Sequence, residues 1–213
     1  MVTRIWFARH GEVEAPFVGT FVGRTDVRLS DLGRHQGQAI AAFLEGQGID
    51  AVLTSPRARA RDTAAALVEA TGIRPEVRPP LAEMDFGEWE TRTWAEIEAR
   101  DPAFAARWAA DPATIPCPGG ESADQFAARV QDHLARVVEE FDGRTVAVFG
   151  HAGTNRAFLA HALGIPYMGS FALCQDYGCL NAGAWGADGA QVALVNLVPG
   201  PMSEAQGDGE RIG

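Results

Sequence analysis

Short apolar runs alternate with longer segments of helical periodicity along most of the chain. Residues 5–8, 51–54 and 145–149 are apolar runs bounded by polar residues or glycine, a pattern typical of buried β-strands. Between them, longer Ala- and Arg-rich segments carry apolar side chains at the spacing of amphipathic helices. Because strands alternate with helices, the pattern predicts an α/β domain with a mostly parallel sheet.

Capping and breaking residues mark the ends of three of the four predicted helices. Ser122 precedes an amphipathic segment, in the N-cap position. Ser55 and Pro56 predict the start of another helix, with serine as N-cap and proline at the first helical position. Gly164 is expected to end the last helix. The expected ranges are 30–47, 55–70, 122–141 and 154–163.

The C-terminal part of the chain departs from this alternation. Residues 178–185 and 191–198 flank a turn sequence, Ala-Asp-Gly at 187–189, which predicts a β-hairpin and an antiparallel sheet edge. From residue 199 the chain becomes polar and rich in glycine. We therefore expect a single domain over residues 1–198 and a polar C-terminal tail over residues 199–213.

Residues from about 85 to 120 also break the alternation. They contain three of the five tryptophans (Trp89, Trp94 and Trp108) and a Pro-Gly-Gly turn at 118–120. We interpret this segment as an inserted, partly helical flap over one end of the sheet. The alternative is that the tryptophans form only a small satellite core.

Composition narrows the possible functions. With 18 basic and 28 acidic residues the net charge is −10, which argues against a nucleic-acid or anionic-membrane surface. All the basic residues are arginines, so lysine Schiff-base and P-loop chemistry are excluded. Cys117, Cys174 and Cys179 form no metal-ligand pattern, and no leader or membrane-spanning run is recognised. We expect a soluble cytoplasmic protein that needs no metal and no cofactor.

Basic residues and histidines follow the apolar runs. Parallel sheets bind ligands beyond the carboxyl ends of their strands, so these positions are candidates for function. Arginine forks, imidazoles and the N-termini of helices together suit a phosphate-sized anion. The three sequences are Arg9-His10-Gly11, Ser55-Pro56-Arg57-Ala58-Arg59 and Gly150-His151-Ala152-Gly153.

Further motifs occur in a fixed order around these three sequences. They are Arg9-His10-Gly11-Glu12, Gly23-x-x-Asp26-x-x-Leu29-Ser30-x-x-Gly33, Ser55-Pro56-x-x-Arg59-Ala60-x-x-Thr63-Ala64, Leu81-x-Glu83-x-x-Phe86-Gly87-x-Trp89-Glu90, Gly120-Glu121-Ser122 and Gly150-His151-Ala152-Gly153. In order and spacing the set resembles the histidine phosphatase superfamily, also called the phosphoglycerate mutase-like family. The resemblance covers about residues 3–198 and implies a three-layer phosphoglycerate mutase-like fold.

The resemblance also implies a role for each site residue. His10 would be the nucleophile that becomes phosphorylated, and Glu83 the acid that protonates the leaving group and then activates water. The phosphoryl oxygens would be bound by Arg9, Arg59 and His151. Substrate binding would involve the side chains or backbone of Arg9, Gly23, Arg59, His151 and Ala152.

General chemistry supports these roles. A neutral imidazole attacks phosphorus well, and a covalent intermediate divides one difficult displacement into two easier ones. Without lysine or metal, the charge on the phosphoryl oxygens must be met by arginine and histidine. An alkoxide is a poor leaving group, so Glu83 must hold a proton, which requires a raised pKa. The alternatives are a structural role for Glu83 and a salt-bridge role for Arg9.

Two departures favour a phosphatase over a phosphoglycerate mutase. Mutases of this family have a similar set of motifs, but they carry an asparagine six residues after the nucleophile, where this chain has Pro16. Their longer insertion is rich in basic residues, whereas this flap offers only Arg92, Arg100 and Arg107. The expected substrate is therefore a small metabolite with one phosphate, and the expected acceptor is water.

Within the family, three stretches resemble the α-ribazole phosphatases of cobalamin biosynthesis. They are residues 83–90, 116–122 and 175–179. An aromatic flap would suit the flat benzimidazole ring of α-ribazole 5′-phosphate. The remaining alternatives are mutase-type phosphoryl transfer, a metal-dependent hydrolase and a non-catalytic phosphate-binding module. A homodimer is possible.

Overall fold

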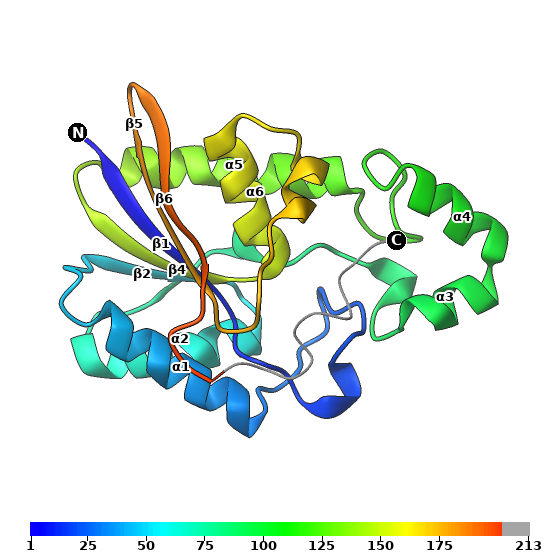
Figure 1. Cartoon of the computed structure of the whole chain (residues 1–213), viewed down its shortest axis with the longest axis horizontal. Helices are drawn as coiled ribbons and strands as arrows, with labels where there is room; N and C mark the ends of the chain where they lie inside the picture. Colours follow the sequence, from blue (N-terminus) through cyan, green and yellow to red (C-terminus); the bar gives the residue numbers. More distant parts are fainter. Residues whose placement is uncertain (202–213) are drawn as a thin grey trace.

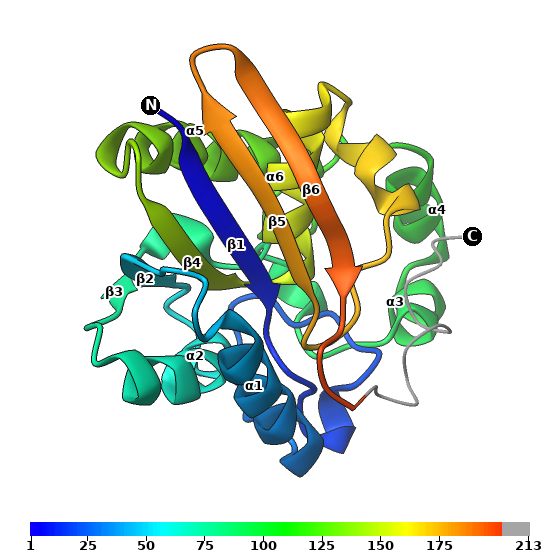
Figure 2. The same ribbon diagram turned by 60° about the vertical axis from the view of Figure 1, so that its left-hand side comes forward.

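A mostly parallel sheet of six strands organises the molecule, in the order β3-β2-β4-β1-β5-β6. The computed structural model describes residues 1–201. Strands β1 to β4 run parallel to one another, and the β5–β6 hairpin continues the sheet from β1 with antiparallel pairing (Figures 1 and 2). The strands are β1 (Thr3–Arg9), β2 (Ala51–Thr54), β3 (Glu76–Val77), β4 (Thr145–Gly150), β5 (Leu180–Gly186) and β6 (Gly189–Leu197).

Helices cover both faces of this sheet, so the predicted three-layer α/β fold is confirmed. Helices α5 and α6 lie on one face, and α1 and α2 on the other (Figure 1). The α-helices are α1 (Asp31–Leu44), α2 (Ala58–Thr71), α3 (Trp94–Arg100), α4 (Pro102–Ala110), α5 (Ala123–Glu140) and α6 (Ala152–Leu163). Short 3-10 helices are η1 (Ala15–Phe17), η2 (Pro79–Leu81), η3 (Gly87–Trp89) and η4 (Tyr167–Ala172).

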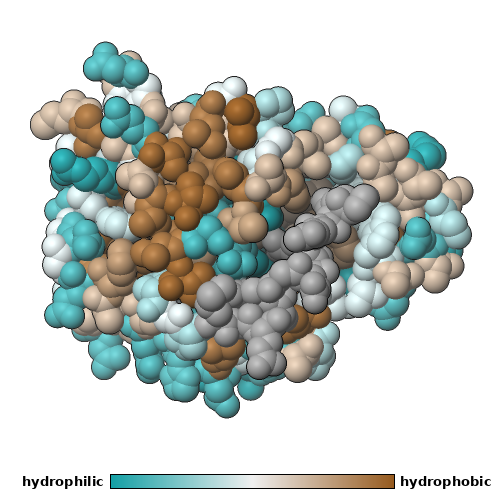
Figure 3. Space-filling model, viewed as in Figure 1, coloured by the Kyte–Doolittle hydropathy of each residue, from teal (hydrophilic) through white to brown (hydrophobic). Residues whose placement is uncertain are grey.

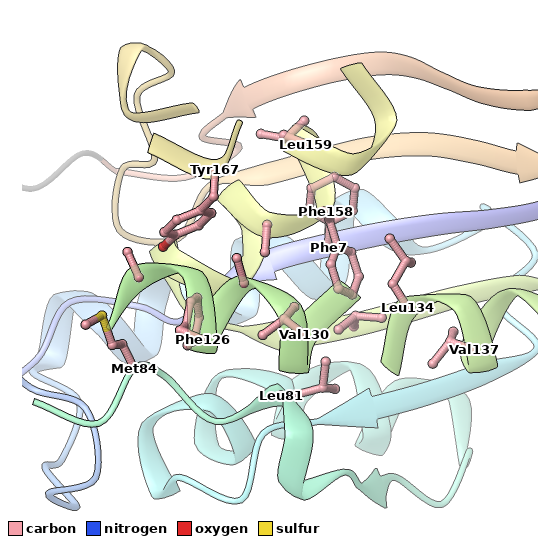
Figure 4. Close-up of a cluster of buried hydrophobic side chains, with 14 of the residues drawn as sticks. Phe7, Leu81, Met84, Phe126, Val130, Leu134, Val137, Phe158, Leu159 and Tyr167 are labelled. Atoms are coloured by element: carbon pink, nitrogen blue, oxygen red, sulfur yellow. The ribbon is translucent and has the colours of Figure 1, made fainter. Parts of the chain in front are cut away.

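The apolar runs supply the core on both sides of the sheet. Along β1, Ile5 and Phe7 join the cluster under α5 and α6, whereas Ala8 joins the cluster under α1 and α2. This alternation follows from the two-residue period of a strand. Figure 4 shows Phe7 against Phe158 of α6, and their ring centroids are 5.4 Å apart.

Most predicted elements are found, with boundaries displaced by up to three residues, since α1 ends at Leu44 and α6 begins at Ala152. The hairpin and the serine cap of α5 are confirmed, and Ser30 also caps α1. The predicted start of the second helix is wrong, because α2 begins at Ala58 and Ser55 does not cap it. Its first turn is stabilised from outside, since the Ala58 N–H donates to Asp26 Oδ1 at 2.8 Å. The two-residue strand β3 was not anticipated.

The flap, residues 85–120, is partly helical as predicted and projects away from the sheet with α3 and α4 (Figure 1). Its tryptophans point inward. Trp89 and Trp108 are buried, with ring centroids 5.0 Å apart, and Phe21 packs edge-on against both. These rings belong to the same core cluster as Phe7. Trp89 and Trp108 therefore form the core of the flap, continuous with that of the sheet, and the half-buried Trp94 packs against them.

The outer edge of the sheet is β6, and it carries exposed apolar residues. Val195 is 38% exposed, and apolar residues gather over β5 and β6 in the view of Figure 3. Within residues 1–201, no helix has the length and apolar character to cross a membrane. Of the predicted polar tail, residues 202–213 lie outside the described part of the chain.

Candidate active site

The register of the central strands brings the predicted site residues to one edge of the sheet. Arg9, the last residue of β1, lies opposite Gly150, the last residue of β4. His10 and His151 therefore follow at neighbouring positions, and their ring centroids are 5.2 Å apart. Strand β2 pairs with the other side of β4 and ends immediately before Ser55. The carboxyl ends of three parallel strands thus form the floor of the site, as expected for an open α/β sheet.

Backbone contacts hold His10 rigidly in this place. Its N–H donates to the Gly150 carbonyl at 3.0 Å, and its own carbonyl accepts the Gly178 N–H at 3.1 Å. The next residue, Gly11, packs so tightly on α1 that a Cβ atom there would lie 2.2 Å from the Gly33 carbonyl oxygen. Close backbone packing therefore explains why glycine follows Arg9 and His10 in this sequence.

The imidazole of His10 is held as a neutral ring with a defined tautomer. Its Nδ1 lies 2.8 Å from the Gly11 carbonyl oxygen, which can only accept, so Nδ1 carries the proton. Nε2 then has a lone pair and accepts the Arg59 Nε–H at 3.2 Å. Burial, together with the positive charges of Arg59 and Arg9, holds the pKa of His10 well below its ordinary value of 6.5. Neutral Nε2 is the form that can attack phosphorus.

Arg59, in the first turn of α2, is fully buried beside His10. Its Nη1 donates to the Thr25 carbonyl at 2.9 Å, and its Nη2 donates to the Val22 and Gly23 carbonyls at 3.0 Å. Burial lowers the pKa of Arg59 to about 10, so the guanidinium is still charged at neutral pH. A fixed positive charge therefore lies next to Nε2 of His10.

The loop of residues 22–25 is held from its other side by Glu90 of the flap. The Glu90 carboxylate accepts backbone N–H groups from Gly23, Arg24 and Thr25 at 2.8–3.2 Å, and the Thr25 hydroxyl at 2.7 Å. At Gly23 a Cβ would lie 1.8 Å from the Met84 carbonyl oxygen, so only glycine fits. Glu90 and Arg59 together fix this loop, and the Gly23 N–H is engaged by Glu90.

His151 lies in the N-cap position of α6 and is fully buried. Its Nε2 is 2.7 Å from the Ser55 hydroxyl, which also accepts the Arg57 N–H at 3.2 Å, just before α2. Burial, with the charge of Arg59, holds the pKa of His151 well below 6.5. Its buried Nδ1 has no hydrogen-bond partner among the described residues. The ring centroids of His151 and His10 are 5.2 Å apart, and a buried nitrogen without a partner in the protein can accept one from a ligand.

Glu83 lies at the N-terminus of the same helix. Its carboxylate accepts the Met84 N–H at 2.9 Å and the Gly153 N–H at 3.0 Å. A Cβ at Gly153 would lie 2.3 Å from Glu83 Oε1, so glycine permits this approach. Burial raises the pKa of Glu83 and outweighs the opposing effects of the two N–H groups and of Arg59. Ala152, the first residue of α6, presents its backbone N–H at the same helix terminus.

Arg9 closes the site on the side of the antiparallel edge. Its Nη1 donates to the Gln175 carbonyl, and its guanidinium lies 3.8 Å from the centroid of the Tyr177 ring. Tyr177 also approaches His10, with ring centroids 5.7 Å apart. The charge of Arg9 lowers the pKa values of His10 and His151 and opposes the rise at Glu83. The structure thus brings all five predicted catalytic residues together.

No cluster of three or more His, Cys, Asp or Glu side chains suited to a metal ion occurs in residues 1–201.

The family model of the histidine phosphatase superfamily (branch 1) matches residues 5–198. The chain belongs to this superfamily.

Individual relatives of this chain carry several names. A bifunctional protein of Mycobacterium tuberculosis (strain H37Rv) is 37% identical over 196 residues, which is 91% of this chain and 54% of that protein. This chain thus spans about half the length of that relative. An adenosylcobalamin/alpha-ribazole phosphatase of Escherichia coli K12 is 30% identical over 179 residues, covering 84% of this chain and 88% of the relative.

Solved structures share the fold of this chain. The alpha-ribazole phosphatase from Shigella flexneri superposes with a TM-score of 0.86 at 26% identity, covering 94% of this chain and all of that chain (100%). The expected phosphoglycerate mutase-like architecture is therefore shown.

Some residues of this candidate site were not assigned a role from the sequence. Ser55 contacts His151, Glu90 holds loop 22–25, and Tyr177 stacks on Arg9. Thr63 donates to the Arg59 carbonyl at 2.7 Å and accepts the Gly11 N–H at 3.0 Å, which ties α2 to the end of β1. Each of these residues lies within or beside a motif, and that position was the available signal.

Proposed function

We propose that this histidine phosphatase hydrolyses a small phosphate monoester in two steps on His10. In the first step Nε2 attacks phosphorus, an Nε2–P bond forms, and the ester P–O bond breaks. Glu83 gives its proton to the leaving oxygen, so an alcohol departs and a carboxylate is left. In the second step that carboxylate takes a proton from water as the water oxygen attacks phosphorus. The Nε2–P bond breaks, inorganic phosphate leaves, and the enzyme returns to its starting state.

The state of His10 carries this proposal. A buried imidazole with its Nδ1 proton committed to a carbonyl and its Nε2 lone pair beside a guanidinium suits a nucleophile for phosphorus. A histidine kept only for packing has no need of two flanking arginines that disfavour its protonation. The raised pKa of Glu83 fits an acid that must hold a proton before the first step.

The remaining site residues would stabilise the phosphoryl group. Arg9 and Arg59 would supply positive charge to its oxygens, and His151 would contribute its unsatisfied Nδ1. We propose that Ala152 contributes its N–H at the start of α6, where the helix terminus favours an anion. Gly23 would contribute to substrate binding as part of loop 22–25.

The flap favours hydrolysis over mutase-type transfer. A mutase must also hold a second phosphate, yet each basic side chain of the flap contacts the flap itself. Arg92 Nε donates to the Glu88 carbonyl at 3.0 Å, and Arg100 lies 3.8 Å from the Glu88 carboxylate. The guanidinium of Arg107 lies 5.8 Å from the Phe104 ring centroid. Water is therefore the proposed acceptor.

For the substrate we propose α-ribazole 5′-phosphate. Support comes from the names of the Escherichia coli relative and of the Shigella flexneri structure. The flap adds little to this support, because Trp89 and Trp108 are buried in its core.

Phosphate release from a panel of monoesters, with a chelator present and the His10→Ala variant alongside, tests both proposals. The panel contains α-ribazole 5′-phosphate, an aryl phosphate, phosphoserine, 3-phosphoglycerate and sugar phosphates. A strong preference for α-ribazole 5′-phosphate supports the substrate. Equal rates on all would overturn the substrate but keep the mechanism. Loss of activity with chelator would favour a metal-dependent hydrolase, and no release from any ester would favour a binding module.

We propose a cytoplasmic location.

A homodimer of this chain stays a prediction. The outer edge of β6 offers unpaired backbone groups and the exposed Val195, which is where a second copy could pair. Sedimentation of the wild type and of Val195→Lys distinguishes the cases. A dimer that the substitution dissociates supports pairing through β6, and a monomeric wild type removes the prediction.

A further inference from the structure

The loop of residues 174–178 meets Arg9 at two points. The Gln175 carbonyl accepts a hydrogen bond from Arg9, and the Tyr177 ring stacks on its guanidinium. The residue between these two contacts is Asp176, so its placement determines both. The Cys179 N–H donates to the Asp176 carbonyl at 3.0 Å, which closes the loop into a tight turn.

Asn196 of β6 holds Asp176 by a reciprocal pair of hydrogen bonds. The Asp176 N–H donates to Asn196 Oδ1 at 2.7 Å, and Asn196 Nδ2 donates to Asp176 Oδ2 at 2.7 Å. Backbone and side chain of one residue are thus both bound by one amide. A carboxamide presents a donor and an acceptor side by side, which this arrangement requires.

The backbone of Asn196 adopts a conformation that most side chains avoid. Its φ is 56°, in the left-handed region, where glycine is favoured and asparagine is tolerated. It lies where the β5–β6 register shifts, between the pairs Leu180–Leu197 and Ala182–Leu194. Bulges of this kind redirect side chains next to functional sites. Here the bulge directs the Asn196 amide toward the loop.

A buried amide network supports the same loop from below. The Gln175 side chain exchanges hydrogen bonds of 2.8 and 2.9 Å with Asn181 of β5 and accepts one of 2.9 Å from Asn155 of α6. Asn181 Oδ1 also accepts the Asn196 N–H at 2.9 Å. The loop is therefore tied to the antiparallel edge of the sheet and to the helix that follows His151.

We propose that Asn196 and Asp176 are a positioning pair, which aims Arg9 at the phosphoryl group by holding the Gln175 carbonyl and the Tyr177 ring in place. This inference deepens the proposed function and rests on it. Neither residue touches the reacting atoms. Arg9 has a long side chain with many rotamers, so its contacts with Gln175 and Tyr177 restrict where its charge lies relative to His10.

Asn196→Gly is the decisive variant, because it removes the paired hydrogen bonds and leaves the left-handed backbone unstrained. We expect an unchanged unfolding temperature, a roughly tenfold or greater fall in kcat/KM, and a similar fall in the affinity for inorganic phosphate measured by calorimetry. Gln191→Ala, at an exposed position on the same strand, is the matched control and should leave both values unchanged. Asp176→Asn keeps an acceptor oxygen and should retain most of the activity.

A double-mutant cycle separates positioning of Arg9 from a general structural effect. In an Arg9→Ala background, Asn196→Gly should cause no further loss of kcat/KM or of phosphate affinity. An equal loss in both backgrounds, or no loss in the wild-type background, would overturn the proposal. If the wild type binds phosphate but hydrolyses no ester, the proposed hydrolysis is wrong. The phosphate affinities of the variants then still test whether Asn196 and Asp176 position Arg9. A wild type that binds no phosphate overturns both.

Discussion

The interior of the flap and the strand-end site (Arg9, His10, Arg59, Glu83 and His151) lie at similar depth and are built from opposite chemistry. Trp108 is 5% exposed and His10 is 7% exposed. Around Trp108 the neighbours are aromatic rings in edge-on contact, which removes apolar area from water. Around His10 the neighbours are guanidinium groups, an imidazole and backbone carbonyls.

This difference separates stability from function within one domain. Burying aromatic rings stabilises the folded chain, whereas burying titratable groups lowers or raises their pKa values at a cost in stability. The flap interior should therefore be sensitive to substitution in its folding and the strand-end site in its turnover. Substitutions in the two regions test this comparison.

The largest effect is expected at the nucleophile. His10→Ala should lower turnover by about 10⁴-fold or more, because no other group is placed to form the covalent intermediate. Its unfolding temperature should stay within a few degrees of the wild type, since the substitution removes a buried group held in an electropositive site. Phosphate release and thermal unfolding measure the two quantities. Activity within tenfold of the wild type would defeat the covalent mechanism.

The opposite outcome is expected in the flap. Trp108→Ala should lower the free energy of unfolding by about 3–5 kcal/mol, because it leaves a cavity among Phe21, Trp89 and Trp94. Denaturant titration measures the loss, and Trp108→Phe should lose less. A decrease below about 1 kcal/mol would mean that the flap core does not stabilise the domain as the comparison states.

A substitution at Glu83 tests whether the strand-end site acts in turnover, because its effect should depend on the leaving group of the ester. Glu83→Gln should lower kcat on alkyl phosphates by about a hundredfold or more, because an alkoxide needs a proton as it departs. An aryl phosphate should lose far less in the first step. Steady-state and burst kinetics on matched alkyl and aryl esters measure both losses. Equal losses on the two esters would remove Glu83 from the role of acid.

The smallest effect is the pH dependence of stability. His10 and His151 have folded pKa values below 6.5, so the unfolded chain binds more protons as pH falls below that value. Stability should therefore decrease as pH is lowered from 7 toward 5, by at most about 1.4 kcal/mol per pH unit for each histidine. Glu83 has a raised pKa and acts in the opposite direction, since its contribution is lost as pH rises through that value.

Denaturant titrations between pH 5 and pH 8 measure this slope. The His10→Ala variant should show a shallower loss of stability on the acid side. The same slope in the variant and in the wild type would contradict the assignment of a neutral buried His10.

Sequence patterns located the strand-end site because its residues follow strands. Arg9, His10 and His151 come directly after apolar runs, and parallel strands end at one edge of a sheet. The same local reasoning failed at Ser55. Its Ser-Pro sequence matches a helix start, but its hydroxyl accepts the Arg57 N–H ahead of the helix and also contacts His151, which is distant in the chain. Local propensity could not anticipate the contact with His151.

The sequence by itself determined the alternation of strands and helices, the antiparallel hairpin and the positions of the basic residues and histidines. These depend on periodicity and on neighbours a few residues apart. Only the tertiary structure decided the order of the strands, the tautomer of His10, the hold of Glu90 on loop 22–25 and the left-handed turn at Asn196. Each of these depends on a hydrogen bond or register between segments far apart in the chain, and such contacts exist only once the sheet has assembled.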